Sequence, residues 1–192
     1  MKKIKLLLCL LMLTSLCGCS SNDSSSKTLN AAMFWISTSL DPTNNYDGWV
    51  LSRIGVGETL LKLNEKYEVE PSLAKSYEQI DDTTWKFTLN DSVTFSNGKK
   101  VTGKHVQQCL ERAFKNNTRT VDYFDLNHVE GKGQEVYLYL NKPSGALLNN
   151  LCEPLFTIYD ASQSDEDIAS HPICTGPFVV DDFVSEKTIE TS

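Results

Sequence analysis

Two runs in the middle of the chain alternate between apolar and polar residues, a pattern that predicts strands with one face buried. In the first run, Trp85, Phe87 and Leu89 are separated by polar residues. In the second run, over 136–140, valine and leucine alternate with tyrosine. Shorter strands are expected at 29–36, 67–69, 93–95 and 178–180.

A helical pattern covers residues 102–116. Thr102 suits the N-cap position, and apolar residues then recur at spacings of three and four. These positions are Val106, Cys109, Leu110, Ala113 and Phe114. Less regular helical patterns occur over 49–61 and 146–155. Strands and helices alternate along the chain, so the sequence predicts a mixed α and β fold.

Composition narrows the class of protein. The 192 residues include 40% hydrophobic residues, which is ordinary for a globular protein and argues against wholesale disorder. The length fits one domain, or one domain with a small satellite. A net charge of −7 argues against a nucleic-acid partner, because such a surface would not neutralise phosphates.

The N-terminus has the features of an export signal. A lysine-rich start precedes an apolar run at 6–13, which is too short to span a bilayer and suits a signal peptide. Leu16-Cys17-Gly18-Cys19 then resembles a bacterial lipobox, followed by a serine-rich stretch. We therefore expect a signal peptide at 1–18, a lipidated Cys19 and a flexible tether at 19–27. The alternative is an ordinary signal peptide cleaved nearby.

Three cysteines remain beyond this segment, namely Cys109, Cys152 and Cys174. An odd number allows one of three pairings with one thiol left over, or no disulfide. His171 and Cys174 have the spacing of half a zinc site, but no second pair accompanies them. The sequence therefore predicts no metal site and no cofactor, and the cysteines suit small buried positions.

Several short motifs follow one another along the chain. They are Leu40-Asp41-Pro42, Glu58-Thr59-Leu60-Leu61, Pro71-Ser72-Leu73-Ala74, the strand 81–89, Val93-Thr94-Phe95-Ser96-Asn97-Gly98 and Thr175-Gly176-Pro177-Phe178. Taken in order, these motifs resemble bacterial extracellular solute-binding proteins of the peptide/nickel type. The resemblance covers about 28–184. It implies a periplasmic-binding-protein-like α/β fold of type II with a mixed sheet. We expect residues 28–192 to form only the first lobe, with an inserted subdomain over about 56–170 and the second lobe missing.

The sequence departs from this family at three places. Asn90 stands where the family usually has arginine, and Cys174 replaces a glycine. The helix opens with Thr102-Gly103-Lys104-His105, where the family usually has an acidic fourth residue. The departure removes a favourable charge from the helix N-terminus, and Gly103 should weaken the helix further.

The resemblance also implies a function. Such proteins are receptors of ABC importers, and two lobes close on a solute. The expected protein is a monomeric, lipid-anchored receptor on the outer face of the cytoplasmic membrane or in the periplasm. Its expected partners are permease subunits and an oligopeptide or metal-chelate ligand, including opine-type metallophores. The alternative from another class is a transport-independent surface lipoprotein, acting as a sensor or adhesin, or an inactive remnant.

The family's ligand contacts fall on five residues of this sequence: Tyr46, Trp49, Arg53, Arg119 and Tyr123. For Arg53 the expected role is to face an anionic group of the ligand. The carry-over to Arg119 and Tyr123 is loose, since their spacing differs by a residue. Structural alternatives stay open, because Trp49 also suits a core position and Arg53 a solvated helix surface.

Catalytic motifs are absent from the sequence. It contains no G-x-S-x-G, no H-E-x-x-H and no phosphate-binding loop. The paired aspartates at 81–82 and 181–182 suit turns or surface positions better than a catalytic dyad. We therefore do not expect an enzyme.

Overall fold

The computed structural model describes residues 37–192. The predicted signal peptide, Cys19, the tether and the predicted strand at 29–36 lie outside these residues and stay predictions. Among the described helices, none has the length and apolar character needed to cross a membrane.

Helices and strands alternate along the described residues. The helices are α2 (Asp47–Arg53), α3 (Gly103–Asn116), α4 (Thr120–Tyr123), α5 (Leu147–Asn150), the 3-10 helix η2 (Pro154–Phe156) and α6 (Asp165–Ser170). The strands are β1 (Leu61–Leu63), β2 (Val69–Pro71), β3 (Ala74–Gln79), β4 (Thr84–Leu89), β5 (Leu126–Lys132), β6 (Glu135–Leu140), β7 (Val180–Val184) and β8 (Thr188–Thr191).

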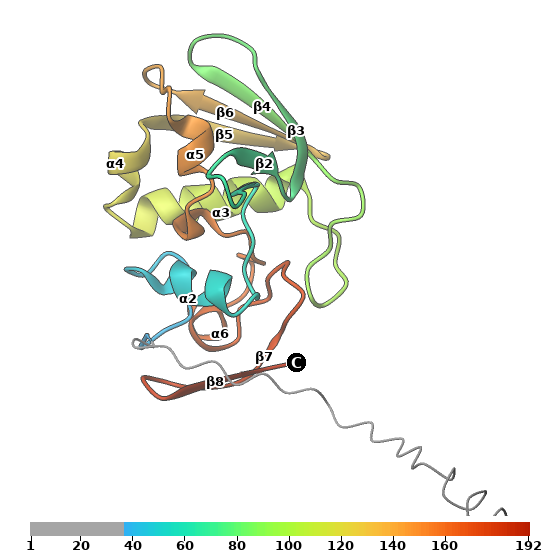
Figure 1. The fold of residues 1–192 in the computed structure, drawn as a ribbon, viewed down its shortest axis with the longest axis vertical. Helices are drawn as coiled ribbons and strands as arrows, with labels where there is room; N and C mark the ends of the chain where they lie inside the picture. Colours follow the sequence, from blue (N-terminus) through green and yellow to red (C-terminus); the bar gives the residue numbers. More distant parts are fainter. Residues whose placement is uncertain (1–36) are drawn as a thin grey trace, which may run out of the picture. The chain divides into compact units, whose positions relative to one another are not determined.

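The main sheet contains four antiparallel strands in the order β3-β4-β6-β5, and α3 packs against β5 and β6 (Figure 1). The two alternating patterns in the sequence are confirmed as β4 and β6, which pair with Phe87 opposite Val136. Both of these residues are fully buried, as is Leu138. The apolar side of this sheet and the apolar side of α3 therefore form one hydrophobic core.

The predicted long helix is confirmed, and its first turn explains one departure from the family. The Nδ1 atom of His105 accepts a hydrogen bond of 3.1 Å from the Thr102 backbone N–H, so imidazole takes the part of the missing carboxylate. A Cβ atom at Gly103 would lie 2.1 Å from the Glu135 carbonyl oxygen. Glycine lowers helix propensity here, but only glycine lets the helix begin this close to the sheet.

Other sequence predictions hold in part or are wrong. The helical pattern over 49–61 yields only α2, because Gly55 turns the chain with a φ of +71° and Glu58 then pairs in extended form with Ile158. The pattern over 146–155 is divided into α5 and η2. The strand expected at 178–180 begins only at Val180. Every strand pairing within residues 37–192 is antiparallel, so the expected mixed sheet is not found in this part of the chain.

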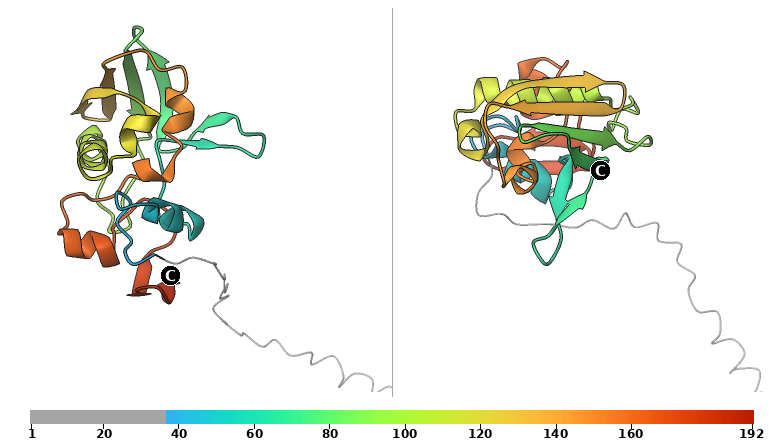
Figure 2. Two further views of the ribbon diagram at one scale, coloured as in Figure 1. Left: turned by 90° about the vertical axis from the view of Figure 1, so that its left-hand side faces the viewer. Right: turned by 90° about the horizontal axis from the view of Figure 1, so that it is seen from above.

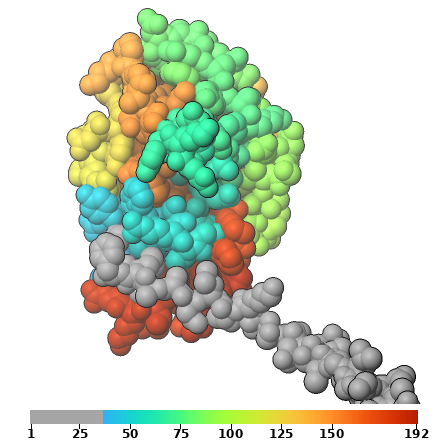
Figure 3. All heavy atoms as spheres, viewed as in Figure 1, coloured from blue at the N-terminus to red at the C-terminus, as the bar shows by residue number. Residues whose placement is uncertain are grey.

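The chain enters and leaves the sheet region through neighbouring segments. Glu58 bridges Ile158, and the Gly176 N–H donates to the Val56 carbonyl at 2.9 Å. An insertion over about 56–170 requires such paired crossings, but its boundaries stay a prediction. The β1–β2 hairpin projects from the sheet (Figure 2). In the surface view, α2 and this hairpin share one face (Figure 3).

Candidate functional site

The end of α3 fixes the position of Arg119. Asn117, the buried C-cap of this helix, donates from Nδ2 to the carbonyl oxygens of Thr43 at 3.1 Å and Asn45 at 3.2 Å. Its Oδ1 atom accepts from the Arg119 backbone N–H at 3.0 Å. One asparagine therefore joins the helix end to the segment that precedes α2 and places Arg119 beside that segment.

The Arg119 guanidinium lies between two tyrosine rings. Its Cζ atom is 3.8 Å from the centre of the Tyr46 ring and 5.8 Å from that of Tyr123. Nη1 donates to the Asn45 carbonyl at 3.0 Å, and Nη2 donates to the Tyr123 hydroxyl at 2.8 Å. These partners are all uncharged, and a guanidinium has five N–H donors. Donors therefore remain for a further, anionic partner.

Glu153 completes this cluster, and the sequence reasoning did not find it. The Tyr123 hydroxyl, which accepts from Arg119, donates to Glu153 Oε1 at 2.9 Å. Burial, together with this carboxylate, raises the pKa of Tyr123 to about 12. Glu153 directly precedes Pro154 at the start of η2. The only signal in the sequence was a polar residue placed just before a buried apolar run.

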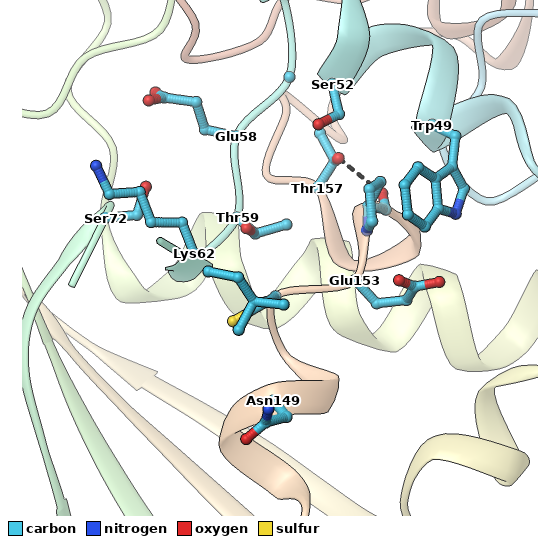
Figure 4. Close-up of a pocket in the computed structure, with 13 residues that line it drawn as sticks. Trp49, Ser52, Glu58, Thr59, Lys62, Ser72, Asn149, Glu153 and Thr157 are labelled. Carbon is cyan, nitrogen blue, oxygen red and sulfur yellow. Dashed lines mark hydrogen bonds between the residues drawn. The ribbon is translucent and has the colours of Figure 1, made fainter. Parts of the chain in front are cut away.

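A hollow of about 430 Å³ adjoins the cluster, and Glu153 belongs to both. Trp49 and Glu153 lie on one side of it, and Glu58 and Lys62 on the other (Figure 4). Burial raises the pKa of Glu58. An aromatic ring, two carboxylates and an ammonium group around one hollow suit a small polar ligand.

The structure brings three of the five predicted site residues together. Tyr46, Arg119 and Tyr123 are in contact. Trp49 is half-buried and lines the hollow, so it is not a core residue. Arg53 is exposed and does not line the hollow, and its Cζ atom lies 5.4 Å from the centre of the Trp49 ring. The position of Arg53 agrees with the solvated alternative, and the role of all five residues as ligand contacts stays a prediction.

The three cysteines of the described residues are free thiols. Cys109 and Cys174 are buried, which fits their predicted role as small core residues. Cys152 is half-buried and lines the hollow. Burial raises the pKa of Cys109 to about 12 and that of Cys152 to about 11, so both are protonated at neutral pH.

Residues 68–191 match the sequence family of bacterial extracellular solute-binding proteins, family 5, middle part. The match covers more than half of the chain, which therefore belongs to this family. The predicted resemblance and the predicted periplasmic-binding-protein-like fold are thereby confirmed.

Among the relatives that this chain matches are nickel proteins. The chain is 32% identical over 177 residues to the nickel-binding protein NikA of Staphylococcus aureus (strain NCTC 8325 / PS 47), a match that spans 92% of this chain and 35% of that protein. A crystal structure of NikA from Staphylococcus aureus in complex with Ni(L-His)2 is similar with a TM-score of 0.75 at 30% identity, over 81% of this chain and 33% of that one. The nickel ABC transporter structure from Bacillus halodurans has a TM-score of 0.75 at 28% identity, over 81% and 32%.

A third structure is informative about the fold alone. It is the periplasmic binding protein DppA from Helicobacter pylori with peptide STSA, at 21% identity and a TM-score of 0.65, over 81% of this chain and 36% of that one. The chain thus spans about a third of the length of the relatives that it matches.

Proposed function

We propose that this chain supplies one side of the ligand site of an ABC-importer receptor for nickel or other metal-chelate complexes. The carrying observation is Arg119, which is held between two tyrosine rings by uncharged partners. A guanidinium prepared in this way is suited to a carboxylate of a metal chelator. The choice of ligand is supported by relatives that are 28–32% identical to the chain and are nickel proteins.

The rest of the proposed assembly follows from family membership. We infer a receptor that is anchored through lipidated Cys19, works as a monomer and delivers its ligand to permease subunits. Binding rather than catalysis is the proposed activity. An oligopeptide is the alternative ligand, and it serves as a competing probe in the test.

The proposal is tested by titrating the purified protein with the nickel complex of L-histidine and, separately, with a tetrapeptide. Trp49 lines the hollow, so its indole N–H signal in the NMR spectrum is a local reporter. We expect weak binding, at millimolar concentrations, because the ligand keeps one face in water on this part of the fold. Arg119→Met should weaken it about tenfold or more, since a charged hydrogen-bond donor is lost.

Lys75→Met is the matched control, because it also removes an exposed cation. Lys75 lies on β3 and pairs with Asp91. This variant should leave binding unchanged. If the tetrapeptide bound and the nickel complex did not, the ligand would be an oligopeptide and not a metal chelate. Binding of the nickel complex that does not depend on Arg119 would overturn the proposed site.

A further inference from the structure

The Arg119 cluster already contains a negative charge that an anionic ligand must meet. Two hydrogen bonds in series, of 2.8 Å and 2.9 Å, separate Arg119 Nη2 from Glu153 Oε1 through the Tyr123 hydroxyl. Within residues 37–192 neither charged group makes an ion pair with another residue. The cluster therefore carries one positive and one negative charge a short distance apart.

This balance of charge discriminates between classes of ligand. A bare carboxylate on Arg119 would leave the half-buried cluster with a net negative charge, which is costly where water is partly excluded. A ligand that places a positive group beside Glu153 keeps the site neutral. Glu153 has room for such a partner, because Tyr123 is the single hydrogen-bond donor to its carboxylate among the described residues and Glu153 lines the hollow.

We propose that Glu153 is a specificity-determining residue that selects ligands with an ammonium group next to their carboxylate, as in an α-amino acid. The carboxylate binds the free N–H groups of Arg119, and the ammonium group donates to Glu153 at about 2.8 Å. The short path between the two protein groups suits adjacent charges better than the two ends of an oligopeptide. This inference rests on the proposed function and narrows its ligand to chelators that keep an ammonium group, not coordinated to the metal, next to a carboxylate.

The test compares two metal-free probes that differ only in the amine. They are L-histidine and 3-(imidazol-4-yl)propionate, and omitting nickel keeps the amine free to carry its proton. Binding is followed by the Trp49 indole signal and by the Tyr123 ring signals. We expect the wild-type protein to prefer L-histidine by about tenfold, which corresponds to about 1.4 kcal/mol.

Glu153→Gln is the decisive variant. Glutamine has nearly the same shape and keeps an oxygen for the Tyr123 hydroxyl, so a purely structural role of Glu153 would leave the preference intact. We expect the preference to fall to about one, by weaker binding of L-histidine and equal or tighter binding of the des-amino probe. Glu130→Gln, which neutralises a carboxylate that pairs with Lys132 on β5 and does not line the hollow, is the matched control and should keep the tenfold preference.

Each remaining outcome counts against a definite statement. If both probes bind equally to the wild-type protein, or if Glu153→Gln keeps the preference, the inference is wrong and the proposed function stands. If the nickel complex binds through Arg119 while neither free probe binds, the inference again fails alone. If nothing binds through Arg119, the proposed function fails and the inference fails with it.

Discussion

Arg112 and Arg119 stand seven positions apart in the sequence, and their surroundings are opposite. Arg112 donates to both carboxylate oxygens of Asp41 at 2.7 Å, and also to Thr43, Tyr159 and Asp165. Arg119 contacts two aromatic rings, a carbonyl and a hydroxyl, and no carboxylate among the described residues. A saturated arginine holds elements together, whereas an arginine with uncharged partners keeps donors for a ligand.

The contacts of Arg112 explain why the Leu40-Asp41-Pro42 motif matters to the fold. The side chains of Arg112 and Asp41 are only 15% and 14% exposed, so each charge depends on the other. Through this pair, α3 is tied to the segment before α2 and to Tyr159 and Asp165. The role of Arg112 is structural, since two carboxylates of the protein already pair with its guanidinium.

The largest expected effect is on stability. Arg112→Ala leaves the Asp41 carboxylate, which is only 14% exposed, without its cation, and we expect it to lower the free energy of unfolding by about 3–5 kcal/mol. Arg119→Ala removes ring stacking and two hydrogen bonds to uncharged groups, so a loss of about 1 kcal/mol is expected. Urea unfolding followed by circular dichroism measures both. Equal losses would remove the distinction between a structural and a ligand-ready arginine.

Of the two arginines, only Arg112, through its pair with Asp41, should make the stability of the fold depend on acid pH. Burial by itself would raise the pKa of Asp41, but hydrogen bonds from Arg112 and Thr43 outweigh it and hold that pKa below its usual value. For a carboxyl with a lowered pKa in the folded state, the stabilisation is present above about pH 4, the pKa in the unfolded chain, and is lost as the pH falls further.

Asp41→Asn should therefore flatten the acid limb of the stability curve below pH 4. One proton accounts for at most about a tenfold change in the folding equilibrium per pH unit. Unfolding midpoints in urea at intervals of half a pH unit give the slope. Arg119→Ala is the control and should keep the wild-type slope; a flattened slope in that variant would show that the two arginines act as one network.

The sequence predicts the fold best where local pattern and tertiary contacts agree. The alternation over 84–89 and the apolar spacing over 102–116 both correspond to observed elements, because each pattern faces the same core. Agreement ends around α2, where a Cβ atom at Gly48 would lie 2.2 Å from the Pro154 carbonyl oxygen. That contact joins residues more than a hundred positions apart, and no local periodicity reports it.

The candidate site, like the fold, could be predicted from the sequence only in part. Family resemblance pointed to Tyr46, Arg119 and Tyr123, and the structure brings these residues into contact. Glu153 and Arg112 went unnoticed, because a lone glutamate and a helical arginine have no local pattern that separates them from surface charges. Their roles depend on partners 30 and 71 positions away, Tyr123 and Asp41 respectively.

The smallest expected effect concerns the first turn of α3, the helix that carries Arg112 and whose end positions Arg119. The neutral His105 ring accepts from the Thr102 N–H, and a protonated ring loses that acceptor at the positive end of the helix. Burial and the nearby Lys99 lower the pKa of His105, although Asp160 opposes them. A histidine with a lowered pKa in the folded state contributes stability above its unfolded pKa of about 6.5, and this contribution decreases as the pH falls.

His105→Ala should cost about 1 kcal/mol at pH 7.5, whereas His105→Asp should restore the cap and remove the loss of stability between pH 7 and pH 5. His171→Asn, at an exposed histidine, is the matched control for urea unfolding at these pH values. If both His105 variants kept the wild-type pH dependence, His105 would not be the titrating cap.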